Sequence, residues 1–282
     1  MTLLAVAVSG RGLVSPDEPV IHADDEALLR GRAAFETIRV YDGRPFRLDR
    51  HLERLCASAA RIGLPPVDCD VLRALAHEAL AAAEDGDVGL RFFWTPGREG
   101  ANEPVALALV STLPPTLVEE RERGLRLATV PTAVSPLLAG VKSTSYAANI
   151  AARDDAARRD ADDAVFLGID GTLLEAPTAN LWFREHETLL TPTLDLPILA
   201  GVTRSVLFEL APRLGYEVEE GVYPVERLLA SDEAFVCSTL REVVGVVAVD
   251  GEAIGDGRPG EAAARLLDAL HETVAAELGA QV

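Results

Sequence analysis

The chain of 282 residues is almost without lysine: it contains one, Lys142, among 26 basic side chains. An arginine guanidinium stays protonated, whereas a lysine amine can lose its proton on burial and then attack a carbonyl to form a Schiff base. The segment around Lys142 reads Leu-Leu-Ala-Gly-Val-Lys-Ser-Thr-Ser-Tyr-Ala-Ala-Asn, which is apolar, small and hydroxylic. Either coding bias left an ordinary solvated lysine here, or the position requires an amine. The surrounding motifs decide between the two.

Cysteine is also scarce, and its pattern excludes a disulfide framework. Cys56, Cys69 and Cys237 are odd in number and lack close metal-ligand spacing, so we expect reduced thiols in a cytoplasmic protein. The five histidines form no cluster. No metal site is therefore expected.

Excess positive charge and long apolar runs are missing as well. A net charge of -19 disfavours nucleic acid as a partner, because phosphate would be repelled. The apolar N-terminal run is too short for a signal sequence or a membrane span and reads as a first strand. With 49% hydrophobic residues, the chain can bury a sizeable core in one large or two modest domains.

Strand and helix patterns alternate along the chain and predict a mixed α/β (α+β) architecture. The period-2 and helical patterns place the elements as follows. Further strands are predicted at 33–41, 44–48, 89–95, 105–113, 125–131, 164–169, 172–175, 181–183, 189–190, 233–238 and 243–249, and helices from 49 onward and at 70–84, 146–159, 202–214 and 261–278. Asp42-Gly43 and Asp170-Gly171 are typical of hairpin turns.

Pro114-Pro115 marks the predicted boundary between two domains. We expect a smaller N-terminal α/β domain at 1–113, a linker at 114–124 and a larger C-terminal domain at 125–282.

Several ordered motifs resemble the class IV aminotransferases, which are pyridoxal phosphate (PLP) enzymes of fold type IV. The resemblance covers nearly the whole chain, with Trp182 and Pro177 as its conservative departures. It rests on Lys142, Glu175-Ala-Pro-Thr-Ala-Asn180, Leu189-Leu-Thr191, Leu199-Ala-Gly-Val-Thr-Arg204, Ala34-Phe-Glu-Thr-Ile-Arg39, Arg47-Leu-Asp-Arg-His-Leu-Glu-Arg54-Leu and Cys237-Ser-Thr-Leu-Arg-Glu-Val243.

The resemblance implies a catalytic and cofactor-binding role for Lys142, which would carry the cofactor as a Schiff base and then move a proton as base and acid. Glu175 would hold the proton of the pyridine nitrogen, and Tyr146 would hydrogen-bond the phenolic oxygen. Leu199 would pack against a face of the ring. Surface or core positions without a cofactor role are the alternatives for Glu175 and Tyr146.

A phosphate group needs oriented N–H donors and a permanent cation. Gly201, Val202 and Thr203 come directly before a predicted helix, whose first N–H groups and positive dipole end favour anions. Arg54 matches the family's phosphate arginine and can contact two oxygens, and Thr239 resembles the threonine that completes the phosphate site. Asn180 and Arg204 are interpreted as structural.

Substrate residues are predicted less sharply. Arg30, Arg91 and Arg241 are the candidate carboxylate-binding cations, and the backbone at Leu240, beside Thr239, is expected to help. The alternative is that these arginines pair with the chain's many acids.

An excess of arginine in the pocket favours a transaminase that moves an amino group between an amino acid and a 2-oxo acid. D-Alanine or D-glutamate is slightly favoured over branched-chain L-amino acids, and the alternatives are a branched-chain L-amino acid aminotransferase or a 4-amino-4-deoxychorismate lyase releasing pyruvate and 4-aminobenzoate. The resemblance also implies a homodimer with the cofactor between the two domains. A non-catalytic protein that merely binds the cofactor is disfavoured by the intact lysine, glutamate and phosphate motifs.

Overall fold

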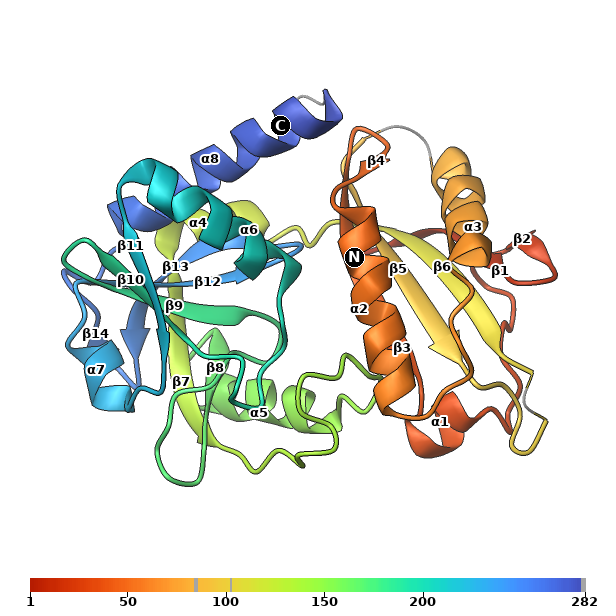
Figure 1. The fold of residues 1–282 in the computed structure, drawn as a ribbon, viewed down its shortest axis with the longest axis horizontal. Helices are drawn as coiled ribbons and strands as arrows, with labels where there is room; N and C mark the ends of the chain where they lie inside the picture. The colour runs from red at the N-terminus through yellow and green to blue at the C-terminus, as the bar shows by residue number, and fades with distance from the viewer. Residues whose placement is uncertain (84–85, 102, 280–282) are drawn as a thin grey trace. The chain divides into compact units, whose positions relative to one another are not determined.

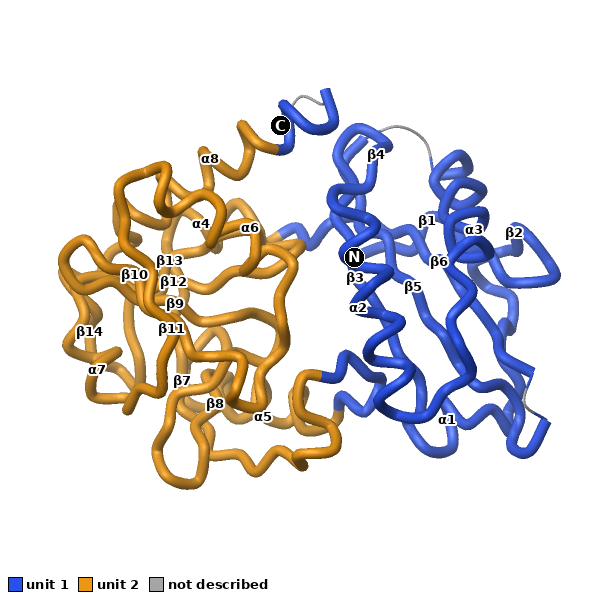
Figure 2. Tube along the Cα trace, in the orientation of Figure 1, with its two compact units in different colours: residues 1–115, 141–146, 274–282 blue, residues 116–140, 147–273 orange. Residues whose placement is uncertain are grey.

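The computed structural model describes residues 1–83, 86–101 and 103–279, and the chain divides into two compact units (Figure 2). Unit 1 contains Met1–Pro115, Val141–Tyr146 and the residues from Val274 onward, and unit 2 contains Thr116–Gly140 and Ala147–Thr273. The first break therefore falls at the proline pair. The segment of Lys142, however, groups with unit 1 and not with residues 125–282 as expected from the sequence.

Unit 1 is an antiparallel sheet with the strand order β2-β1-β6-β5-β3-β4, and α2 and α3 pack against it (Figure 1). Its elements are β1 (Leu3–Val8), β2 (Gly12–Val14), α1 (Glu26–Arg30), β3 (Ala34–Tyr41), β4 (Arg44–Pro45), α2 (Leu48–Arg61), α3 (Cys69–Ala82), β5 (Val88–Thr95) and β6 (Val105–Thr112). Leu52, Leu55 and Ala59 recur at helical spacing on α2, and they are buried with Ile38 and Leu90 of the sheet. The apolar periodicity of α2 thus fixes which of its faces meets β3.

Unit 2 is built on a mixed sheet with the order β11-β10-β9-β12-β13-β7-β8, and β14 pairs with β13. Its elements are α4 (Leu117–Arg123), β7 (Leu125–Pro131), α5 (Ala147–Arg158), β8 (Asp163–Leu167), β9 (Asn180–Glu185), β10 (Thr188–Pro192), α6 (Val202–Leu210), a 3₁₀ turn (Ala211–Leu214), β11 (Glu217–Gly221), α7 (Val225–Leu229), β12 (Glu233–Ser238), β13 (Glu242–Val249) and β14 (Glu252–Ala253). The helix α8 (Glu261–Leu278) begins in unit 2, and its residues from Val274 onward belong to unit 1. The pairs β10/β11, β7/β13 and β7/β8 are parallel. The mixed α/β class predicted from the sequence is confirmed.

Most predicted elements are present, and the differences have local causes. The return strand 44–48 is cut to Arg44–Pro45 because α2 already begins at Leu48. The helix predicted at 202–214 ends at Leu210 and continues as a 3₁₀ turn, since Pro212 has no N–H to donate. Residues 172–175 pair with β8 through the hydrogen bond from Leu174 N to Phe166 O (3.0 Å) but form no assigned strand. The predicted end of the helix 70–84 lies outside the described residues.

Most of the predicted linker 114–124 forms α4. Leu117 is buried, and the side chain of Arg121 pairs with Glu242 of β13. These contacts hold α4 against the sheet of unit 2 and explain why a charged stretch after two prolines is ordered.

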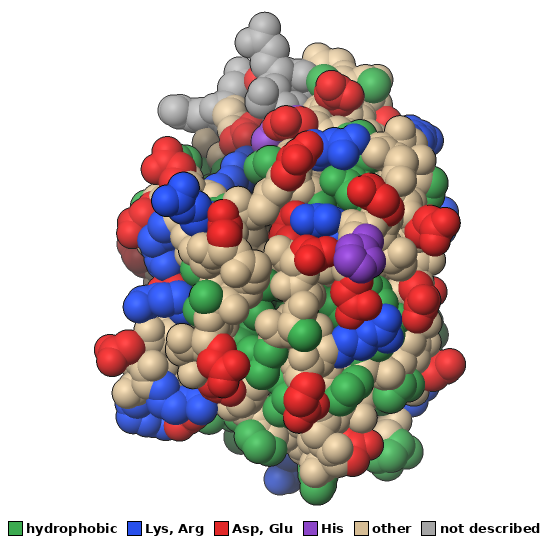
Figure 3. Space-filling view, turned by 90° about the vertical axis from the view of Figure 1, so that its left-hand side faces the viewer, with side chains coloured by type: hydrophobic (Ala, Val, Ile, Leu, Met, Phe, Trp, Pro, Cys, Tyr) green, Lys and Arg blue, Asp and Glu red, His purple; other side chains and the backbone are tan. Residues whose placement is uncertain are grey.

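The surface charge and the helices can both be compared with the composition of the sequence. The face drawn in Figure 3 carries acidic and basic side chains interspersed, without a broad area of positive charge. Among the helices in the described part of the chain, none is long and apolar enough to cross a membrane.

Candidate active site

Backbone hydrogen bonds attach the Lys142 segment to β3 of unit 1. The N–H of Phe35 donates to the carbonyl of Lys142 (3.0 Å), and the N–H of Thr144 donates to the carbonyl of Ala33 (2.9 Å). From α2, the hydroxyl of Ser58 accepts from the N–H of Lys142 (3.1 Å). Three contacts distant in sequence therefore set the position of the lysine backbone.

The side chain of Lys142 lies against an aromatic surface. Its Nζ is 4.4 Å from the ring centroid of Phe35. Tyr146 meets the same ring edge-on at 5.5 Å between centroids, and Phe93 stacks on it at 5.8 Å. The amine of Lys142 and the ring of Tyr146 therefore each contact Phe35 within unit 1.

Next to Phe35, the carboxylate of Glu36 is fully buried and binds two residues of α2. Arg54 donates to both its oxygens, from Nε to Oε1 and from Nη2 to Oε2, each at 2.7 Å. His51 Nδ1 lies 2.8 Å from Oε2. The guanidinium of Arg54 is thus fixed by a bidentate pair on one of its sides.

These contacts change the ionisation of the cluster. Burial by itself would raise the pKa of Glu36, but the charge and hydrogen bonds of Arg54, together with His51, lower that pKa to about 2. Burial lowers the pKa of His51, and Arg54 and Lys142 lower it further against the opposing effect of Glu36. At neutral pH, Glu36 is ionised and His51 is neutral, so its Nδ1 carries the proton donated to the carboxylate.

Glu36, His51 and Ser58 have no assigned role in the sequence analysis. The spacing of His51, Arg54 and Ser58 was the available signal, because residues three and four apart lie on one face of a helix. That this face meets the buried end of β3 required the tertiary structure.

In unit 2, Glu175 is held at the start of the turn that leads into β9. The N–H of Leu199 donates to its Oε1 (3.1 Å), and the Asn180 amide donates to its Oε2 (3.0 Å). The same amide donates to the carbonyl of Leu199 (2.9 Å). Glu175 and Leu199, predicted as cofactor residues, are therefore brought together by Asn180.

The loop from Leu199 enters α6 through Gly201, Val202 and Thr203. Gly201 is the N-cap and leaves the first N–H groups of α6 without intrahelical acceptors. A Cβ built on Gly201 would lie 2.0 Å from Oδ1 of Asn180, so only glycine fits. A helix start with no side-chain cap and a required glycine is suited to bind an anion.

Thr239 and Leu240 lie in the turn between β12 and β13, and Arg241 fixes this turn. Its guanidinium donates to Asp163 (2.6 Å) and Glu120 (3.0 Å). Burial alone would lower the pKa of Arg241, but the two carboxylates raise it. The pairing with acids, left open in the sequence analysis, is what the structure shows for Arg241.

The other two candidate arginines belong to unit 1. Arg30 is exposed and pairs with Glu99 at 2.9 Å. Arg91 is half-buried, with Nη2 3.3 Å from the sulfur of Met1, and burial lowers its pKa. Arg91 is thus the candidate that the structure leaves without a described acidic partner in a salt bridge.

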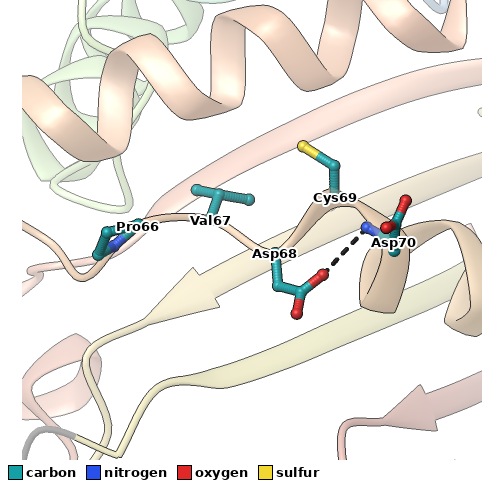
Figure 4. A pocket seen from close by; sticks show the side chains of 5 residues that line it. All are labelled: Pro66, Val67, Asp68, Cys69 and Asp70. Atoms are coloured by element: carbon teal, nitrogen blue, oxygen red, sulfur yellow. Dashed lines mark hydrogen bonds between the residues drawn. The ribbon is translucent and has the colours of Figure 1, made fainter.

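A separate pocket of about 390 Å³ lies at the start of α3 and is lined by Pro66, Val67, Asp68, Cys69 and Asp70 (Figure 4). Asp68 accepts from the N–H of Asp70 and caps the helix. The Sγ atoms of Cys69 and Cys56 are 3.5 Å apart as free thiols. None of the predicted site residues lines this pocket.

In the described ranges, no three or more His, Cys, Asp and Glu side chains are grouped so that they could hold a metal ion. The described partners of the Glu175 carboxylate are the N–H of Leu199 and the amide of Asn180, and the amine of Lys142 lies against the ring of Phe35.

Comparisons with known proteins add to this geometry. The family model for amino-transferases of class IV matches residues 33–249. A bifunctional aminodeoxychorismate lyase / D-amino acid transaminase from Mycobacterium tuberculosis is 32% identical, over 94% of this chain and 98% of that protein. A D-alanine aminotransferase from Bacillus licheniformis is 27% identical, over 97% and 98%. The structure of a hypothetical aminotransferase from Mycobacterium tuberculosis in its PLP-bound form superposes with a TM-score of 0.90 at 30% identity and covers 97% of this chain and 99% of that one.

Proposed function

The chain belongs to the class IV aminotransferases, an enzyme family with pyridoxal phosphate as cofactor, and from this premise we propose that it is a transaminase for D-amino acids. The single observation that carries the transaminase chemistry is Lys142, the sole lysine, which backbone hydrogen bonds and a contact with the Phe35 ring hold in unit 1. An amine at this position serves covalent chemistry that no arginine could perform.

The predicted cofactor residues suit the chemical groups of pyridoxal phosphate. Gly201 has no Cβ, and a Cβ at this position would collide with Asn180. The start of α6 offers N–H groups to a phosphate. Arg54 supplies the permanent cation, and Thr239 a further hydroxyl. The carboxylate of Glu175 suits a protonated pyridine nitrogen, Tyr146 the phenolic oxygen, and Leu199 a face of the ring.

When bound, pyridoxal phosphate supplies an electron sink conjugated with the α-carbon of the substrate. Lys142 would hold the cofactor covalently, and its Nζ would move the proton from the α-carbon of the substrate to the cofactor carbon. Glu175 would hold the proton of the ring nitrogen, which would preserve the electron sink. Glu36 keeps Arg54 oriented through its bidentate pair.

The preference for D-amino acids is supported by the names of the two relatives described above. Of the candidate substrate cations, Arg30 and Arg241 are engaged with acids, so we propose Arg91 as the carboxylate-binding arginine and the Leu240 backbone as its complement. Arg241 is held by the buried carboxylate of Asp163 and by Glu120, so it is not needed in this proposal as a substrate-binding cation.

Aminodeoxychorismate lyase activity is the second candidate, because the Mycobacterium tuberculosis relative carries both activities in its name. The lyase reaction needs one substrate and no oxo-acid acceptor. A branched-chain L-amino acid aminotransferase is the remaining alternative.

A visible absorption scan of the holoenzyme tests these candidates. Separate additions of D-alanine, D-glutamate and L-leucine should identify one donor that removes the band of the lysine-bound cofactor, and 2-oxoglutarate should restore it. Lys142→Ala is the control without the covalent link. If no amino acid changes the band while aminodeoxychorismate yields pyruvate and 4-aminobenzoate, the lyase replaces the transaminase.

We also propose a cytoplasmic homodimer. Cys56 and Cys69 are free thiols whose Sγ atoms lie 3.5 Å apart without a disulfide bond, which suits a reducing compartment. Leu28 of unit 1 and Leu137 of unit 2 are 62% and 78% exposed, and a second copy would cover such side chains. Sedimentation equilibrium should give twice the chain mass, and a monomer at micromolar concentration would contradict the dimer.

A further inference from the structure

Asn180 occupies the centre of a closed hydrogen-bond network in unit 2. It is the first residue of β9 and is 4% exposed. Its amide donates to Oε2 of Glu175 (3.0 Å) and to the carbonyl of Leu199 (2.9 Å), while the N–H of Leu199 donates to Oε1 of Glu175 (3.1 Å). Each member of the network therefore contacts the other two.

The orientation of the Asn180 amide follows from its partners. Glu175 and Leu199 present oxygen acceptors, so both contacts require N–H donors and exclude the flipped amide. The amide oxygen then lies against Gly201, where a Cβ would be 2.0 Å away. One side chain thus contacts the carboxylate, the loop at Leu199 and the residue that caps α6.

We infer that Asn180 is a positioning residue that couples the Glu175 carboxylate to the Leu199–Thr203 loop, so that the acceptor for the ring nitrogen and the donors for the phosphate are set together. This inference rests on the roles proposed above for Glu175 and Gly201. It gives Asn180 a function beyond that of a structural residue that hydrogen-bonds the backbone of a turn. Alanine at this position would remove the hydrogen bonds that the amide donates to one oxygen of Glu175 and to the carbonyl of Leu199.

Two substitutions separate positioning from packing. Asn180→Ala removes both N–H donors. Asn180→Asp keeps the shape but faces the Glu175 carboxylate and the Leu199 carbonyl with a second carboxylate, whose repulsion is relieved when a proton is taken up. Asn149→Ala is the matched control, because Asn149 also donates to a backbone carbonyl of unit 2, that of Pro177 (2.7 Å), and does not contact Glu175 in the described hydrogen bonds.

The experiment measures equilibrium dissociation constants of the apoenzyme for three ligands: pyridoxal phosphate, its analogue with C–H in place of the ring nitrogen, and pyridoxal without phosphate. Asn180→Ala should weaken pyridoxal phosphate about tenfold to a hundredfold, as expected when buried acceptors lose their donors. The loss should shrink for both analogues, since each lacks one of the two groups that Asn180 helps to bind. Asn180→Asp should show the same pattern and recover affinity on acidification, and Asn149→Ala should bind all three ligands like the wild type.

A loss of equal size for all three ligands, or no loss at all, would overturn the positioning role. Circular dichroism establishes that each variant is folded, and Asn180→Asp carries the test if Asn180→Ala is not. Failure of the proposed cofactor site has a different signature, because the wild-type protein would then not bind pyridoxal phosphate through Lys142, as judged by borohydride reduction and peptide mapping. Failure of the transaminase activity alone would leave this binding intact and would appear only in the absorption scan with amino acids.

Discussion

Glu36→Gln tests how much a buried ionic cluster contributes to this fold. Glu36 is 0% exposed and receives two hydrogen bonds from Arg54 and one from His51. The glutamine amide would remove the charge and leave the guanidinium of Arg54 without its counter-ion. Removing one member of a buried pair costs about 3–5 kcal/mol, which is a large part of a total stability of about 5–15 kcal/mol.

Urea unfolding of the apoprotein, followed by circular dichroism, measures the change without interference from the cofactor. Glu99→Gln is the matched control: it removes the partner of Arg30 in an exposed pair of similar length, 2.9 Å, and should cost at most about 1 kcal/mol. The double variant Glu36→Gln/Arg54→Met should be more stable than Glu36→Gln, because the uncompensated charge is gone. If Glu36→Gln and Glu99→Gln destabilise by the same amount, the buried pair has no special weight and the reasoning is wrong.

Three further predictions concern the ionisation of His51 and Glu36, the amine of Lys142 and the glycine at position 201. The fold lowers the pKa of His51 from 6.5 and that of Glu36 from 4.5 to about 2. As the pH falls, the unfolded chain therefore binds these protons before the folded chain does, and the free energy of unfolding should decrease below pH 6.5 and again between about pH 4.5 and 2. Thermal melts should show the first decrease in wild type but not in His51→Gln. Lys142→Arg keeps the charge but cannot form the covalent link, so turnover should fall at least about 10³-fold while the melting temperature of the apoprotein stays unchanged. Residual turnover near wild type would exclude Lys142 as catalytic. Gly201→Ala should destabilise by about 1–3 kcal/mol through its clash with Asn180, as measured by chemical unfolding; an unchanged midpoint would show that the loop yields.

Local patterns in the sequence predicted most of the secondary structure and the class of chemistry. The strand β7 and the helix α8 have the predicted bounds, because period-2 and period-3.6 patterns act over a few neighbouring residues. The positive φ of Asp42 and Gly43 likewise follows from turn chemistry that is local. A sole lysine indicated an amine with a special task because arginine cannot replace it there.

Contacts between distant segments were decided only by the tertiary structure. The sequence places Lys142 with the later residues, whereas hydrogen bonds to Phe35 and Ser58 tie it to unit 1. Arg241 is cationic in any sequence analysis, but its engagement by Asp163 and Glu120 depends on residues 78 and 121 positions away. A sequence determines which side chains can donate, accept or carry charge, whereas the packing of distant elements determines which of them meet, because each such contact is stabilised by the rest of the fold.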